Sequence, residues 1–168
     1  IYAHIAPLPQ VESEAVKQAE ETHKSLKVIT AQDIRWKRCD IKSTNLLANC
    51  LMKQRALEIG ADDTILLQDK QVIEATSSNV FLVKDGTLVT PPADEQLLSG
   101  ITREFVMALA TKNHLNLEVR DVNVTELYEA DEVWLTSSTQ EISPVVKVDD
   151  AIIGTHTEYA GQVGPIWH

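Results

Sequence analysis

Four short strand-forming runs, grouped around two tight-turn signals, constrain the fold of this chain more than any other feature. The runs cover residues 64–68, 71–75, 79–83 and 87–90. Asp69-Lys70 separates the first two runs, and Asp85-Gly86 separates the last two. An Asp-Gly pair between two apolar runs is a strong hairpin signal, because both of its residues tolerate a left-handed backbone. The middle of the chain is therefore predicted to form two consecutive β-hairpins.

Helical segments flank these hairpins. Apolar side chains recur at helical spacing over residues 43–59 and 101–113, with Ser43 or Thr44 as the cap of the first helix and Gly60 after its end. One side of the second helix is predicted to consist of Phe105, Val106, Leu109 and Ala110. Further strands are predicted over 1–8, 27–30, 117–122, 133–136, 142–148 and 151–154, and further helices over 11–26 and 124–128. The expected fold class is α+β or mixed α/β, with a β-rich core and flanking helices.

Composition excludes several partners and kinds of site. The 168 residues carry 25 acidic and 15 basic side chains, whereas nucleic acids and anionic membranes attract basic patches. No apolar run approaches the ~20 residues that span a bilayer. The five histidines lack metal-ligand spacing, so no metal site is predicted. Two cysteines are too few for a disulfide scaffold and suit a reducing, cytoplasmic location.

Two of four polar segments carry a candidate reactive group. Lys42 ends a basic run that starts at Arg35, and burial would make its amine a nucleophile toward a carbonyl. The alternative is a solvated basic patch. Glu74 alternates with Val72 and Thr76 on one strand face, where an inward carboxylate needs a cationic or N–H partner. The alternative is an exposed glutamate at a strand end.

The other two segments are rich in hydrogen-bond donors. Residues 97–103 open the second helix, where free backbone amides beside a glycine and a threonine favour a phosphate. Residues 136–142 contain four hydroxyl side chains between two strands, which can donate to one anion. The alternative for residues 97–103 is an ordinary helix cap, and the alternative for residues 136–142 is a solvated loop. Together, the four segments supply a lysine for an aldehyde, an acid for a ring nitrogen and two sets of phosphate ligands, which is the equipment for pyridoxal 5′-phosphate.

The segment from Asp33 to Val146 resembles the class IV aminotransferase family of pyridoxal-phosphate enzymes. The resemblance rests on four motifs in order: RWKRCDIKSTNLL, VIEATSSNVFLVKDG, LLSGITR and TSSTQEISPV. The CDIKSTNLL run is most similar to the D-amino-acid aminotransferase branch, and branched-chain aminotransferases and aminodeoxychorismate lyases are relatives. The resemblance implies the larger, C-terminal domain of the D-amino-acid aminotransferase-like fold.

The resemblance also implies a role for each matching residue. Lys42 would bind the cofactor aldehyde covalently and then move the proton between the substrate Cα and the cofactor. Glu74 would pair with the pyridinium nitrogen, and Leu98 would pack on the ring. The phosphate would be held by Arg35, Gly100, Ile101, Thr102 and Ser138, with Ser137 near the phosphate or substrate. Ser77 and Asn79 would support these residues without touching the cofactor themselves.

The implied activity is transfer of an amino group between an amino acid, with a D-amino acid favoured, and a 2-oxo acid. A homodimer is expected, with no nucleic acid or membrane partner. Residues 1–32 are expected to be an entry strand and linker from a missing N-terminal domain, and residues 33–168 the cofactor-binding domain, shortened at its C-terminal helix. Such a fragment could be inactive alone. A lyase, a branched-chain aminotransferase and a non-catalytic binding or assembly domain are the alternatives.

Overall fold

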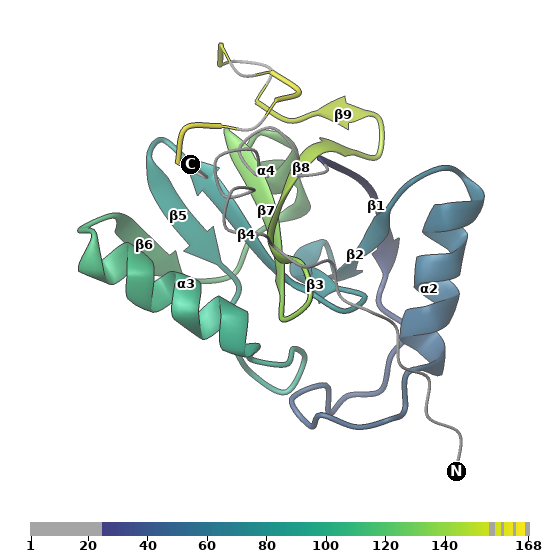
Figure 1. Ribbon diagram of the computed structural model, residues 1–168. Helices are drawn as coiled ribbons and strands as arrows, with labels where there is room; N and C mark the ends of the chain where they lie inside the picture. Colours follow the sequence, from purple (N-terminus) through teal and green to yellow (C-terminus); the bar gives the residue numbers. More distant parts are fainter. Residues whose placement is uncertain (1–24, 155–156, 159, 163, 167–168) are drawn as a thin grey trace, which may run out of the picture.

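One mixed β-sheet organises the chain in the computed structural model, which describes residues 25–154, 157–158, 160–162 and 164–166. The strands are β1 (Leu26–Gln32), β2 (Asp63–Gln68), β3 (Gln71–Ala75), β4 (Asn79–Lys84), β5 (Thr87–Thr90), β6 (Asn116–Val119), β7 (Glu132–Ser137), β8 (Glu141–Val148) and β9 (Ala151–Ile152). The helices are α2 (Leu47–Glu58), α3 (Ile101–Lys112) and α4 (Val124–Tyr128). The sheet order is β3-β2-β1-β8-β7-β4-β5-β6, and β9 pairs with β8 (Figure 1).

Both predicted hairpins are confirmed. β2 pairs antiparallel with β3, and β4 pairs antiparallel with β5. The central turn residues have positive φ angles, 49° at Asp69 and 69° at Lys70, then 49° at Asp85 and 72° at Gly86. Turns with two left-handed central residues match the twist of the adjoining strands. Because β1 runs parallel to β2 and β8, the sheet is mixed, as the predicted fold class requires.

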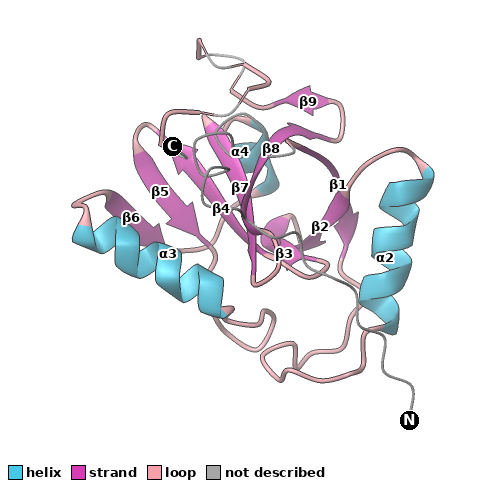
Figure 2. Cartoon of the chain, viewed as in Figure 1, coloured by secondary structure: helices cyan, strands magenta, loops and turns pink. Residues whose placement is uncertain are grey.

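The core lies on both faces of this sheet. Alternation along β4 places Val80 and Leu82 in one apolar cluster and Phe81 in the other. The first cluster includes Leu127 of α4, and the second includes Val106 and Ala110 of α3. Figure 2 shows these two helices at separate places along the sheet. Phe81 packs against Trp134 of β7 with the ring centroids 6.4 Å apart. This packing on both sides fixes the start of β4, where Asn79 enters the site described below.

The two longer helices depart from the prediction at their ends and on their surfaces. α2 starts four residues later than expected, with Leu46 as its N-cap and no side-chain cap. On α3, Val106 and Ala110 are buried, whereas Phe105 is 64% exposed and Leu109 42% exposed. The prediction of one four-residue apolar side was therefore wrong for α3, because the helix packs on the sheet through Val106, Met107 and Ala110 and leaves Phe105 and Leu109 outside that contact.

Two of the later strands end earlier than expected. The expected strands over 117–122 and 151–154 are shorter, at Asn116–Val119 and Ala151–Ile152. The predicted strand over 1–8, and all but the last two residues of the predicted helix over 11–26, lie outside the described residues. Among the described parts of the chain, no helix is both long and apolar enough to cross a membrane. No group of three or more metal-ligating side chains occurs in those parts either.

Candidate functional site

Two long loops meet at one edge of the sheet and bring most of the predicted motifs together. Residues 33–46 connect β1 to α2, and residues 91–100 connect β5 to α3. Both loops lie below the sheet in Figure 1, between α2 and α3. The Cys39 amide donates to the Glu95 carbonyl at 2.8 Å, which joins them directly. The first, second and third polar segments of the sequence therefore share one region.

Glu74 of β3 lies at the centre of this region with 6% of its surface exposed. Its Oε1 accepts a hydrogen bond from Arg35 Nη1, and its Oε2 accepts from Asn79 Nδ2 at 3.1 Å and from the Leu98 amide at 3.3 Å. Of the two alternatives for Glu74, the structure shows the inward one, with both a cationic and an N–H partner. Burial raises the pKa of Glu74 to about 7, although the Arg35 charge pulls it down. This carboxyl group is therefore poised to gain or lose a proton near neutral pH.

The guanidinium group of Arg35 contacts mainly carboxylates. Its side chain is 5% exposed, forms ion pairs with Asp33 and Glu74, and donates from Nη2 to the Gln96 carbonyl at 3.0 Å. Among the described residues only one hydrogen of Nη1 remains without an acceptor. The phosphate role expected for Arg35 stays a prediction, and these contacts favour a different role as the partner of Glu74. Sequence reasoning missed Asp33, whose Oδ1 also accepts from the Arg35 amide two residues later, at 2.8 Å.

Asn79, the first residue of β4, joins the buried acid to the start of α3. Its Nδ2 donates to the Leu98 carbonyl at 2.8 Å as well as to Glu74, and its Oδ1 accepts from the Gly100 amide at 3.1 Å. A Cβ atom on Gly100 would lie 2.6 Å from that Oδ1. Residue 100 therefore has to be glycine for the loop to approach Asn79 this closely. Asn79 thus takes the supporting position that the family resemblance implied.

The start of α3 presents free backbone donors. Gly100 is the N-cap with an extended backbone, and Ile101 and Thr102 are the first two helical residues. No carbonyl within the helix can accept from these two amides, so they remain available to an anion. Ile101 is 87% exposed, which leaves this end of the helix accessible. The anion site expected at residues 97–103 stays a prediction, and this open helix start is compatible with it.

The hydroxyl-rich segment contributes in a way the sequence did not reveal. Thr136 of β7 lies directly opposite Asn79 of β4, so the two side chains share the site face of the sheet. Its buried Oγ1 has no hydrogen-bond partner among the described residues. Ser137 Oγ instead accepts from the Gln140 amide at 3.1 Å, and Ser138 is exposed in the turn. Alternation along β7 could have identified Thr136, because it pairs in register with a polar residue.

Lys42 is exposed, so the expectation of a buried amine was wrong for this structure. All of residues 41–46 are exposed, because no described element covers that part of the loop. The following helix is nevertheless tied to the site. Asn49 Nδ2 donates to the Thr76 carbonyl at 2.7 Å, two residues beyond Glu74. Lys42 is therefore held between the Cys39–Glu95 contact and an anchored helix, with its amine in solvent.

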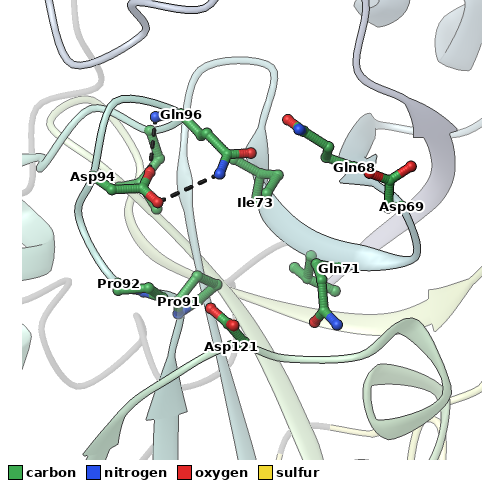
Figure 3. Close-up of a pocket in the computed structure, with 11 residues that line it drawn as sticks. Gln68, Asp69, Gln71, Ile73, Pro91, Pro92, Asp94, Gln96 and Asp121 are labelled. Carbon is green, nitrogen blue, oxygen red and sulfur yellow. Dashed lines mark hydrogen bonds between the residues drawn. The ribbon is translucent and has the colours of Figure 1, made fainter.

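A cavity of 230 Å³ lies between the 91–100 loop and the β2–β3 hairpin. Its lining residues include Gln68, Gln71, Pro91, Asp94 and Asp121 (Figure 3). None of the predicted site residues lines it. The candidate site is therefore distinct from this cavity.

The sequence of this chain matches the model of one protein family, described as amino-transferase class IV, over residues 2–148. The chain belongs to the class IV aminotransferase family. It is 44% identical over 150 residues to a D-alanine aminotransferase of Bacillus licheniformis, covering 89% of this chain and 51% of that protein. It is 35% identical to a D-alanine aminotransferase of Staphylococcus haemolyticus, covering 97% of this chain and 58% of that protein.

Solved aminotransferase structures share the fold. A T.th. branched-chain amino acid aminotransferase, determined with pyridoxamine 5′-phosphate, superposes with a TM-score of 0.78 at 30% identity, covering 88% of this chain and 48% of that one. A putative 4-amino-4-deoxychorismate lyase of Legionella pneumophila superposes with a TM-score of 0.72 at 27% identity, covering 79% of this chain and 51% of that one. This class IV aminotransferase chain spans about half the length of the curated relatives it matches.

Proposed function

We propose that this chain is the pyridoxal-phosphate-binding part of an aminotransferase that moves an amino group between an amino acid and a 2-oxo acid. The observation that carries the proposal is the hydrogen-bonded connection from Glu74 through Asn79 to Gly100. It joins a buried acid, suited to a ring nitrogen, to a helix start suited to a phosphate. D-Alanine is the favoured donor, because the D-alanine aminotransferase of Bacillus licheniformis is 44% identical to this chain.

The residues present fit pyridoxal 5′-phosphate. The buried carboxyl group of Glu74 has a pKa of about 7. The buried hydroxyl of Thr136 has no hydrogen-bond partner among the described residues. The amides of Ile101 and Thr102 face outward from the first turn of a helix of 12 residues. When bound, the cofactor supplies an electron-accepting ring for chemistry at the substrate Cα. The T.th. branched-chain aminotransferase was determined with pyridoxamine 5′-phosphate, which supports the same ligand class here.

The residues of this chain then have separate tasks. Glu74 would hold a proton at the ring nitrogen, with Arg35 and Asn79 keeping the carboxylate in place. The Gly100–Thr102 loop would hold the phosphate, and Leu98 would pack on the ring face. The Lys42 amine would hold the cofactor aldehyde and move a proton at the substrate Cα. Ser137 and Ser138 remain proposed ligands near the phosphate.

We propose that the cofactor-binding unit comprises residues 33–168 and that the protein is a cytoplasmic homodimer. Exposed apolar side chains on α2 and α3 support a partner surface, including Leu47 at 70% and Phe105 at 64% exposed. Cys39 and Cys50 are both free thiols, which suits a reducing compartment. Size-exclusion chromatography with light scattering tests the dimer.

Absorbance spectroscopy tests the proposed function. The purified chain mixed with pyridoxal 5′-phosphate is expected to acquire the yellow absorbance of a lysine-bound cofactor, which borohydride makes permanent. Lys42→Ala abolishes the band, whereas Lys37→Ala, which removes an exposed lysine of the same loop, leaves it. A band that survives in Lys42→Ala, or one lost equally in both variants, refutes the assignment of Lys42.

Substrate assays separate the remaining alternatives. D-Alanine with a 2-oxo acid should give pyruvate, whereas branched L-amino acids or aminodeoxychorismate as the preferred substrate would favour the other family activities. The lyase alternative is supported by the structural likeness to the Legionella pneumophila protein, at a TM-score of 0.72. A chain that binds no cofactor covalently would support the non-catalytic alternative.

A further inference from the structure

Arg103, in the first turn of α3, is a buried cation that the proposed chemistry does not use. It is 2% exposed. Its Nη2 donates to the Pro91 carbonyl at 2.9 Å, just beyond the end of β5, and its Nη1 donates to Ser99 Oγ at 3.2 Å. One guanidinium group therefore holds the loop that precedes α3 against the end of a sheet strand.

The charge of Arg103 is poorly balanced within the described residues. Its ion-pair partner there is Glu104, at 3.0 Å, whose side chain is 57% exposed and so largely solvated. The Nε atom is buried and has no hydrogen-bond partner in the same set of residues. Burial lowers the pKa of Arg103, although Glu104 opposes this effect. A buried cation at the positive end of a helix is costly unless an anion offsets it.

Two features of the loop tie this charge to the phosphate site. Ser99, which accepts from Arg103, is adjacent to Gly100, whose amide donates to Asn79 Oδ1. The amides of Ile101 and Thr102 follow these two residues and precede Arg103 directly. The loop is therefore held at two neighbouring residues just before the free amides, and one of the two contacts is made by a positive charge.

We propose that Arg103 is a positioning residue for the phosphate group: it holds the Ser99–Thr102 loop in its anion-binding shape and adds a buried positive charge that favours a dianion. The inference rests on the proposed function and deepens it. It predicts that Arg103 discriminates between ligands with and without a phosphate, although its guanidinium is engaged by Pro91 and Ser99.

The test compares pyridoxal 5′-phosphate, pyridoxal and inorganic phosphate on the full chain. Arg103→Met should weaken pyridoxal 5′-phosphate binding about tenfold or more and leave pyridoxal binding nearly unchanged, because one partly screened charge is removed. Arg120→Met removes an arginine that pairs with Glu118 and Glu126 near β6, and it should change neither. An equal loss for both pyridoxal ligands, or no loss, overturns the proposal.

A second variant keeps the test valid if Arg103→Met does not fold. Glu104 Oε1 accepts from both Ser99 Oγ and Arg103 Nη1. Glu104→Gln removes the negative charge but keeps an oxygen that can accept from both, so it should tighten phosphate binding a few-fold, with Glu118→Gln as a control of similar exposure, at 54%. Unchanged or weaker phosphate binding in Glu104→Gln contradicts the proposal. Inorganic phosphate is read from the rise in melting temperature, which needs no lysine chemistry. Failure of the Lys42 assignment is therefore distinguishable from failure of this inference.

Discussion

Replacing Glu74 with glutamine should remove a specific part of the pH dependence of stability. The folded-state pKa of Glu74 is about 7, against an ordinary value of 4.5. Because each pH unit between these values is worth about 1.4 kcal/mol, ionising Glu74 in the folded state costs about 3 kcal/mol. The folded state binds the extra proton, so the contribution of Glu74 to stability is present in full below pH 4.5 and is lost as the pH rises through about 7.

The assay is urea unfolding of the cofactor-free chain between pH 4.5 and 8. The wild type should lose about 3 kcal/mol more than Glu74→Gln across this interval, because glutamine cannot ionise. Glu118→Gln, which changes an exposed residue, should follow the wild type. An identical pH slope in the wild type and Glu74→Gln would show that Glu74 is already ionised throughout, and the account of its burial would be wrong.

The remaining predictions concern packing and a half-buried ion pair. Gly100→Ala should cost about 2–3 kcal/mol in unfolding experiments, since its Cβ would approach Asn79 Oδ1 to 2.6 Å, and this cost should shrink in an Asn79→Ala background. Equal costs in both backgrounds would exclude that clash. Lys53→Met should lower the free energy of unfolding by about 1–2 kcal/mol, because it removes the cationic partner, at 2.9 Å, of the 5%-exposed Asp63 carboxylate. Lys147→Met, at a solvent-exposed pair, should cost less than about 0.5 kcal/mol, and equal losses would refute the burial argument.

Local chemistry made some of the fold predictable from sequence. The Asp85-Gly86 and Asp69-Lys70 turns dictate left-handed backbones, so both hairpins could be placed to within a residue. The start of α2 could not, because Ser43 and Thr44 offered caps that the helix does not use. Local propensity does not determine the residue at which a helix starts when tertiary contacts favour another one.

The site was predictable in its parts and less so in its arrangement. Alternation placed Glu74 on the strand face of Val72 and Thr76 but left open whether that face was buried, and the structure shows that Glu74 is buried. The contact of Arg35 with Glu74 depends on two loops meeting, which spacing along the chain does not encode. The exposure of Lys42 has the same origin, because burial depends on what packs over a loop.

The central claim is that the amine of residue 42 anchors the cofactor. Peptide mapping by mass spectrometry after borohydride reduction measures it most directly, because reduction attaches the cofactor permanently to one lysine. We expect the added mass to appear on the peptide containing Lys42. Its appearance on Lys37, Lys53 or another lysine, with the peptide of Lys42 unmodified, would contradict the claim.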